Sequence, residues 1–360
     1  MTIKRWLRTV LPLGALVLCV ALVAYTVPSD TLRVLGERAA QLSAGLRAPR
    51  DSVEWLEGRL TRPTAVATAP QVVLGTARTQ AVTTTAATTT ATAPARKDGG
   101  IVLTQQLSAG SNFVQDVAIR NKSGKTVDIA AALKHIPALG LKKNSTAPQV
   151  LIVHTHTTEC YMSYDNGFYN SDDPTRTDDP QKNMVAVGER VAAALRAAGI
   201  GVLHDTAIHD QPYNGAYSHS KAAVERYLKA NPTIRVVLDL HRDAIYQDAT
   251  THVKPTVTVD GKKAAQVMII VGLKNTKAVP NTHTAENLSF GVRLQQALHQ
   301  THPGLARPLL LADARYNQQL SNGSLLIEMG SDANTLEEAC YSGDLLGGVL
   351  ATVLKGLGAS

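Results

Sequence analysis

The sequence predicts an α/β fold: a three-layer sandwich with a central mixed sheet and helices on both faces, preceded by a transmembrane helix and a disordered stalk. Residues 10–27 form a continuous apolar run. Residues 79–95 contain eight threonines and six alanines among 17 positions. From residue 148 onward, short apolar runs alternate with segments of helical periodicity. Such alternation is typical of a sheet covered by helices.

The apolar run near the N-terminus has 18 residues, which is enough to cross a bilayer as a helix. Lysine and arginine precede it, and a positive flank of this kind stays on the cytoplasmic side. A cleaved signal peptide is the alternative, but no small-x-small cleavage site follows the run, and Leu18 before Cys19 fits a lipoprotein site poorly. We therefore expect residues 1–28 to be an uncleaved single-pass anchor, with the rest of the chain outside the cytoplasm.

Residues 29–100 are expected to form a stalk, because the Thr/Ala-rich segment near its end cannot bury a core. The formal net charge is +7, of which residues 1–100 carry +6. A nucleic-acid-binding face would concentrate this charge on the folded domain, so the sequence excludes nucleic acid as a partner. A basic stalk beside a membrane is suited instead to anionic lipid or wall polymer. The folded domain is expected at residues 101–360.

The folded domain alternates predicted strands and helices. Asp260 and Gly261 are expected to form the turn of a hairpin between residues 253–259 and 265–271. The other expected strands are residues 150–154, 201–204, 234–240, 309–311 and 324–328, and the expected helices are residues 183–198, 220–230, 286–300 and 335–354.

Polar side chains stand at the ends of three of these strands. The segments read V-L-I-V-H-T-H-T-T-E at 150–159, V-V-L-D-L-H-R-D at 236–243 and S-L-L-I-E-M-G at 324–330. Ligands of open α/β sheets bind beyond the carboxyl ends of the strands. Three such ends at one edge of the sheet would therefore make a site.

The residue types at these ends favour a metal-dependent hydrolase. His156 and Glu159 have the H-x-x-E spacing that lets both reach one ion, and His241 would supply a distant third ligand. Two histidines, one glutamate and a water form the open catalytic zinc site, Zn2+ lowering the pKa of its water. Glu328 ends a buried strand and is the candidate general base.

Several of these side chains have competing interpretations. His154 competes with Glu159 for the middle ligand position, and Glu159 could instead be a solvated loop carboxylate. Asp239 shares a strand face with the distant histidine ligand and would either orient that ligand or only cap a loop. Glu328 could be a structural acid paired with Arg242.

Other catalytic templates are absent from the sequence. It contains neither a G-x-S-x-G nucleophile elbow nor a G-x-x-x-x-G-K-[ST] phosphate loop. Three cysteines make no disulfide framework, and Cys160 and Cys340 could pair in an oxidising compartment or both be free thiols. Cys160 could act as a nucleophile, but the crowd of potential ligands around it makes a metal site the simpler interpretation.

Four stretches resemble the stage II sporulation protein P family of endospore-forming bacteria. The resemblance covers about residues 114–354, together with the single anchor and the long stalk. The stretches are V-L-I-V-H-T-H-T-T-E-C-Y, N-M-V-A-V-G-E-R-V-A-A-A-L-R-A-A-G-I, V-L-D-L-H-R-D-A and L-L-I-E-M-G-S-D-A-N-T-L-E-E-A.

This resemblance implies a zinc amidase related to the N-acetylmuramoyl-L-alanine amidases, with endopeptidase activity on cross-linked stem peptides of peptidoglycan. It also implies a place at the sporulation septum, in wall remodelling and engulfment, beside two other membrane proteins, one of them a lytic transglycosylase. His156 and His241 match the histidine motifs of the family, and Glu328 matches its late glutamate. The resemblance leaves two candidates for the middle ligand, Glu159 and a residue before Asn183. Cys160 stands where many relatives are expected to have serine.

Two other functions are weighed against a zinc-dependent peptidoglycan hydrolase. A non-catalytic peptidoglycan-binding module would keep the fold but lack a ligand or the base, and none is missing here. A zinc carboxypeptidase-like peptidase also uses H-x-x-E and a distant histidine, but it needs a cation for the substrate carboxylate. Arg242 is adjacent, yet it is expected on the opposite face of its strand.

Overall fold

The computed structural model describes residues 95–108, 113–143 and 145–358. The predicted anchor and almost all of the predicted stalk lie outside these residues. In the part of the chain that is described, no helix is both long and apolar enough to span a membrane. The described residues belong to the second of two compact units, which begins at Ala86.

A mixed eight-stranded sheet organises the domain. Strands β4, β7 and β13 run parallel to one another, so their carboxyl ends lie at one edge, whereas β11 is antiparallel to β13. In spatial order the strands are β2 (Phe113–Val114), β3 (Val117–Lys122), β12 (Leu309–Ala312), β11 (Val267–Gly272), β13 (Ser324–Ser331), β7 (Val236–Asp243), β4 (Val150–Val153) and β6 (Val202–His204).

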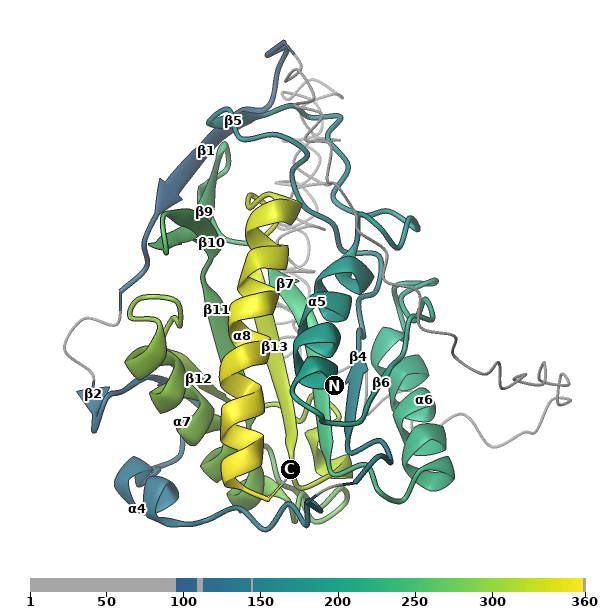
Figure 1. Cartoon of the computed structure of the whole chain (residues 1–360). Helices are drawn as coiled ribbons and strands as arrows, with labels where there is room; N and C mark the ends of the chain where they lie inside the picture. Colours follow the sequence, from purple (N-terminus) through teal and green to yellow (C-terminus); the bar gives the residue numbers. More distant parts are fainter. Residues whose placement is uncertain (1–94, 109–112, 144, 359–360) are drawn as a thin grey trace, which may run out of the picture. The chain divides into compact units, whose positions relative to one another are not determined.

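Helices cover both faces of this sheet. Figure 1 shows α8 (Leu336–Gly356) and α5 (Met184–Ala197) lying across one face, with α7 (Thr284–Thr301) and the short α4 (Ile129–Lys134) on the same side. The other face carries α6 (Ala216–Ala230) and the 3-10 helix η1 (Gln318–Leu320). Side chains along β4 alternate between the two cores, as a strand buried on both faces requires.

Local sequence explains the two central helices. Thr335 accepts a hydrogen bond from the Glu338 N–H and the Glu338 carboxylate accepts one from the Thr335 N–H, a capping box that starts α8. Asn183 caps α5 through the Val185 N–H at 3.0 Å. Gly347 lets α8 approach α5 closely, because a Cβ there would lie 2.6 Å from that of Ala194.

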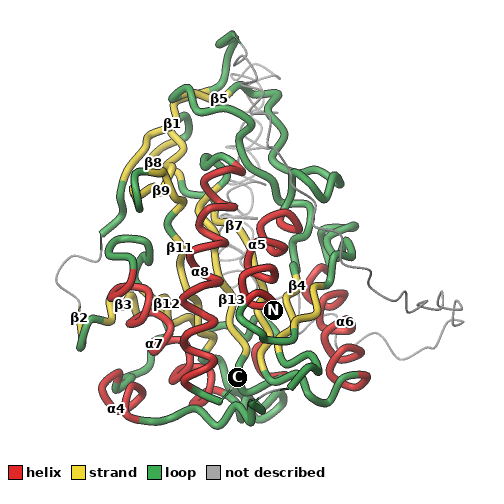
Figure 2. Tube along the Cα trace, viewed as in Figure 1, coloured by secondary structure: helices red, strands yellow, loops and turns green. Residues whose placement is uncertain are grey.

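A second sheet, absent from the prediction, adjoins the first. Strand β9 pairs with β1 in parallel and with β10 and β8 antiparallel, and β5 pairs with β1. Figure 2 shows these strands in yellow near the top of the view. Their bounds are β1 (Gly100–Gln105), β5 (Phe168–Tyr169), β8 (Tyr246–Asp248), β9 (Thr251–Val259) and β10 (Lys262–Ala265).

The predicted hairpin is wrong in its second arm. Residues 262–265 pair with β9 across the expected turn, but the chain then leaves this sheet and enters the main sheet as β11. Gln266 marks the change: its buried amide accepts from the Leu107 N–H at 2.6 Å and donates to the Gly304 carbonyl at 2.6 Å. Because both segments are apolar, periodicity alone does not reveal the break.

The remaining predicted strands and helices are confirmed, with shifted ends. Strands β7 and β13 each run three residues further than predicted, to Asp243 and Ser331. His241 and Glu328 therefore lie within paired strands rather than beyond them. The α/β class with a mixed sheet is confirmed, whereas the predicted transmembrane helix and stalk fall outside the described residues, apart from residues 95–100.

Candidate active site

The carboxyl ends of β7 and β13 place two of the predicted site residues side by side. Glu328 lies opposite His241 in the parallel register of these strands. Burial alone would lower the pKa of His241, but the carboxylates of Asp239, Glu159 and Glu328 raise it to about 9. Burial raises the pKa of Glu328 to about 8, and the carboxylate of Asp243 acts in the same direction. Acidic groups thus surround a nearly buried imidazole.

The turn after β4 brings His156 to the same edge. Its ring centroid lies 5.3 Å from that of His241, with the two rings nearly perpendicular. Tyr217 also faces both imidazoles, at 5.7 Å from His156 and 6.3 Å from His241. Burial, with the neighbouring His241, lowers the pKa of His156 to about 3.

Glu159 completes the group from the same turn. Its Oε2 lies 4.0 Å from Nδ1 of His241 and accepts a hydrogen bond from the Arg242 N–H at 3.2 Å. The guanidinium of Arg176 lies 3.6 Å from Oε1. Burial raises the pKa of this carboxyl, while Arg242 and His241 oppose the shift. Glu159 is therefore a buried, held carboxylate and not a solvated one.

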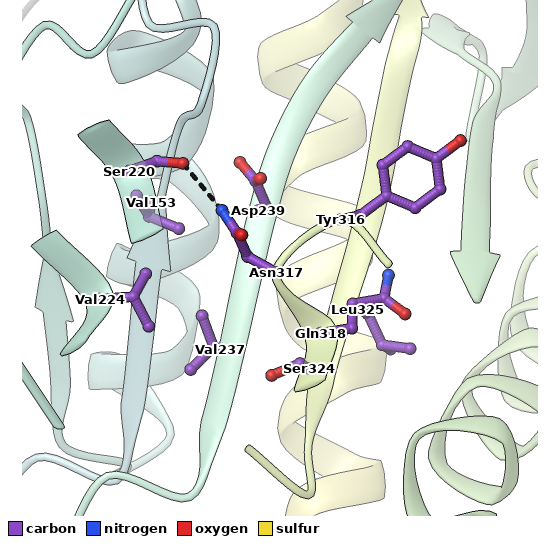
Figure 3. A pocket seen from close by; sticks show the side chains of 10 residues that line it. All are labelled: Val153, Ser220, Val224, Val237, Asp239, Tyr316, Asn317, Gln318, Ser324 and Leu325. Carbon is purple, nitrogen blue, oxygen red and sulfur yellow. Dashed lines mark hydrogen bonds between the residues drawn. The ribbon is translucent and has the colours of Figure 1, made fainter. Parts of the chain in front are cut away.

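Asp239 holds His241 from behind. Its Oδ1 lies 2.9 Å from Nε2 of His241, although the angles are not those of a hydrogen bond. The Thr155 N–H and hydroxyl donate to this carboxylate at 2.8 and 2.6 Å. Ser220 Oγ lies 2.7 Å from the Thr155 hydroxyl, and Figure 3 shows the Asn317 amide reaching Ser220 beside Asp239. The carboxylate is thus fixed by a buried polar network.

His154 lies deeper than the other candidates. It is fully buried, with Nδ1 at 3.0 Å from the Leu240 carbonyl and Nε2 at 2.9 Å from Nε2 of His204. His204 in turn contacts Glu189 at 3.1 Å. Both nitrogens of His154 are therefore engaged away from the edge where His156 lies.

Arg242 anchors the turn and does not pair with Glu328. Its Nε donates to the Cys160 carbonyl at 3.0 Å and its Nη2 to the Thr175 carbonyl at 2.7 Å. Both thiols outside the apolar run are free, and Cys160 Sγ donates to the Pro174 carbonyl at 3.1 Å. Cys160 and Cys340 therefore form no disulfide.

Two residues that the sequence did not single out lie beside His156 and Glu159. Tyr213, on the loop between β6 and α6, stacks on His156 with centroids 4.9 Å apart and is 58% exposed. The Arg176 guanidinium lies 4.8 Å from the centre of the Tyr213 ring and bonds to Asp210 at 2.5 Å. Both residues come from irregular loops, where no periodicity or motif indicates a role.

The side chains at this edge are of the types that bind metal ions. As they stand in the described part of the chain, however, no group of three His, Cys, Asp or Glu side chains is placed so that it could hold one. Nevertheless, His156 Nδ1 and Glu328 Oε2 are buried without a hydrogen-bond partner, and Nε2 of His241 has only its contact with the Asp239 carboxylate at 2.9 Å. Unpaired buried polar atoms are costly, so their gathering at one edge indicates that a further partner completes it.

The model of the stage II sporulation protein P family matches residues 79–351. The chain belongs to this family. The family member of Bacillus subtilis (strain 168) is 29% identical over an alignment of 201 residues, and the match covers 52% of this chain and 47% of that protein. The chain thus matches about half the length of this curated relative.

Solved amidase structures resemble the chain more distantly. One is the CwlD amidase of Clostridioides difficile in complex with the GerS lipoprotein, at 14% identity and a TM-score of 0.37, covering 58% of this chain and 98% of that one. Another is the N-acetylmuramyl-L-alanine amidase Ami1 of Mycobacterium smegmatis, at 12% identity and a TM-score of 0.35, covering 59% and 98%.

The raised pKa of Glu328 predicts a stability gain on its neutralisation. A carboxyl whose pKa rises from 4.5 to about 8 on folding costs the protein stability as the pH climbs through that window. In chelator-treated protein at pH 7.5, Glu328→Gln should raise the free energy of unfolding by on the order of 1–3 kcal/mol. Urea denaturation followed by circular dichroism should show the two proteins converging near pH 4.

Glu337→Gln is the matched control, because Glu337 is exposed on the first turn of α8. This variant should follow the wild-type curve. An unchanged pH dependence in Glu328→Gln would contradict the burial of an ionisable carboxyl at this edge.

Proposed function

We propose that the chain is a zinc-dependent peptidoglycan hydrolase: an N-acetylmuramoyl-L-alanine amidase that also cleaves cross-linked stem peptides as an endopeptidase. The observation that carries the proposal is the meeting of His156, Glu159, His241 and Glu328 at one sheet edge, with polar atoms left unpaired. Membership of the stage II sporulation protein P family supports the same chemistry.

His156, Glu159 and His241 are the residues that would hold the zinc ion. When bound, zinc polarises a carbonyl and lowers the pKa of a water to the neutral range. Asp239 fixes the imidazole of His241 and the backbone N–H of Arg242 fixes Glu159. Such outer contacts keep ligands oriented and are as necessary as the ligands themselves.

Glu328 is suited to move the proton. Amide hydrolysis requires a group that removes a proton from the attacking water and delivers it to the leaving amine of the stem peptide. A carboxyl with a pKa near the working pH does both efficiently, and burial together with Asp243 raises the pKa of Glu328 to about 8. Its place beside His241 puts it within the same site.

Removal of either histidine should remove the metal. His156→Ala and His241→Ala are each expected to weaken zinc binding by more than the roughly 10–100-fold typical of losing an outer contact. Metal analysis of the purified variants tests this, with His135→Ala as the control because His135 lies on the surface beside Glu286. A full zinc complement in both variants would move the ligand role to His154.

Loss of the basic oxygen should stop hydrolysis while leaving the site assembled. Glu328→Gln should stay folded, zinc-loaded and able to bind peptidoglycan, with turnover reduced at least ~100-fold, the lower range for losing a general base. Mass analysis of muropeptide digests measures this, with Glu337→Gln as control. Near-normal turnover in Glu328→Gln would rule out Glu328 as the general base. Loss of zinc from this variant would make Glu328 a ligand and leave Glu159 as the base.

The same digest separates the alternative functions. An amidase releases whole stem peptides, an endopeptidase splits cross-links, a carboxypeptidase-like enzyme removes a terminal residue, and a binding module changes nothing. The described geometry favours the amidase over the carboxypeptidase, because Arg242 donates to backbone carbonyls and is not free for a substrate carboxylate.

We further propose that the enzyme acts in septal wall remodelling and engulfment during sporulation. In this proposal residues 1–28 anchor it in the membrane by one helix, and the catalytic domain lies outside the cytoplasm with other engulfment proteins, including a lytic transglycosylase. Family membership and the basic flank of the apolar run support this placement.

Protease added to intact protoplasts should release a fragment that begins within residues 79–95, because this Thr/Ala-rich segment cannot form a protected core. Immunoblotting against the C-terminal domain reports the fragment, and a cytoplasmic protein serves as the control for lysis. Complete protection of the domain in unlysed cells would overturn the proposed topology.

A further inference from the structure

A cluster of aromatic and imidazole rings lies on the second sheet, outside the proposed catalytic group. His252 of β9 stacks on Tyr169 of β5 with ring centroids 4.1 Å apart and meets the edge of Tyr246 of β8 at 4.6 Å. The Tyr246 side is open to solvent, since this residue is 56% exposed. The cluster therefore presents an aromatic face that the catalytic proposal does not use.

The fold makes room for this cluster. Gly100 of β1 lies opposite Tyr169. A Cβ at this position would lie 1.9 Å from the Thr250 carbonyl oxygen and 2.7 Å from two atoms of the Tyr169 side chain. A larger residue would therefore clash with the backbone that leads into β9 as well as with the ring that supports His252. The arrangement depends on three separate strands and a glycine, and it is not a chance surface contact.

Asp332 stands behind the rings with one oxygen unpaired. Its Oδ2 lies 3.2 Å from Nδ1 of His252 and accepts from the Tyr246 hydroxyl at 3.4 Å. Its Oδ1 is buried without a hydrogen-bond partner, in a residue that is only 6% exposed. A buried acceptor left unpaired is costly, which points to a donor supplied by a ligand.

The cluster adjoins the proposed catalytic edge. The Asp332 N–H donates to the Asp243 carbonyl at 2.9 Å, and Asp332 follows Glu328 by four residues. Tyr246 lies five positions after His241, a span of at most about 18 Å even in a fully extended chain. A polymer bound at the edge can therefore reach the rings as well.

We propose that Tyr246, His252 and Asp332 form a carbohydrate subsite that takes one sugar ring of the glycan strand. The apolar face of a pyranose packs on an exposed aromatic ring, and a sugar hydroxyl or acetamido N–H donates to the carboxylate. A neutral donor suits Asp332 better than a cation, because the charge of the buried Arg242 guanidinium already acts on this carboxylate. The choice of glycan rests on the proposed function.

The test measures binding separately from hydrolysis. Isothermal titration of the full-length protein with peptide-free N-acetylglucosamine–N-acetylmuramic acid tetrasaccharide should give a measurable Kd. Tyr246→Ala and Asp332→Asn should each raise that Kd about tenfold or more, while Tyr246→Phe, which keeps the ring, should raise it less. Phe113→Ala is the matched control. Phe113 is an exposed aromatic residue on β2, a strand of the other sheet, and its ring centroid lies 5.5 Å from that of His299.

Each outcome decides the proposal. Absence of tetrasaccharide binding by the wild type, or an unchanged Kd in Tyr246→Ala with a wild-type circular dichroism spectrum, overturns the subsite. An effect of Phe113→Ala equal to that of Tyr246→Ala also overturns it. Tetrasaccharide binding that depends on Tyr246 in a protein without amidase activity would sustain the subsite and overturn the proposed function, so the two failures are distinguishable.

Discussion

The parallel pairing of β13 and β4 with β7 is the constraint on which the site depends. It sets Glu328 beside His241 and brings the turn after β4 to the same edge. Because side chains alternate along a strand, a slip of one residue in either pair would turn one partner to the opposite face of the sheet. The apolar side chains of these strands pack into the cores on both faces of the sheet and hold the strands together.

Holding several charges at this edge is costly, and the surrounding structure offsets that cost. Asp239 accepts two hydrogen bonds from Thr155, and the Arg242 guanidinium donates hydrogen bonds to the carbonyls of Cys160 and Thr175. Removing one member of such a network leaves a buried group unpaired, which costs more than the pair contributed. The buried polar atoms of His156 and Glu328 that have no hydrogen-bond partner mark the place where a further partner would bind.

The sequence predicts the main sheet, its principal helices and the core of the site because these depend on local patterns. Apolar runs that lead into His241 and Glu328 identify both strands, although β7 and β13 continue to Asp243 and Ser331. The second sheet is not predicted because Thr251–Val259 pairs with Gly100–Gln105, about 150 residues away in the sequence. In addition, the chain passes from one sheet to the other at Gln266, inside an apolar segment that carries no turn signal.

Spacing alone does not distinguish His154 from His156 as a site residue. The structure shows His154 in contact with His204 and His156 at the edge of the sheet. Arg176 and Tyr213 lie on loops, and only tertiary contacts bring them to the site.

We propose that His156, Glu159 and His241 act together as one metal site with Glu328 beside it. A crystal structure of zinc-soaked protein, with anomalous data collected on both sides of the zinc edge, would reveal such a site. We expect one strong anomalous peak in contact with His156, Glu159 and His241, with the Glu328 carboxylate nearby but not bound. A peak between His154 and His204, or no ordered zinc at the edge, would contradict it.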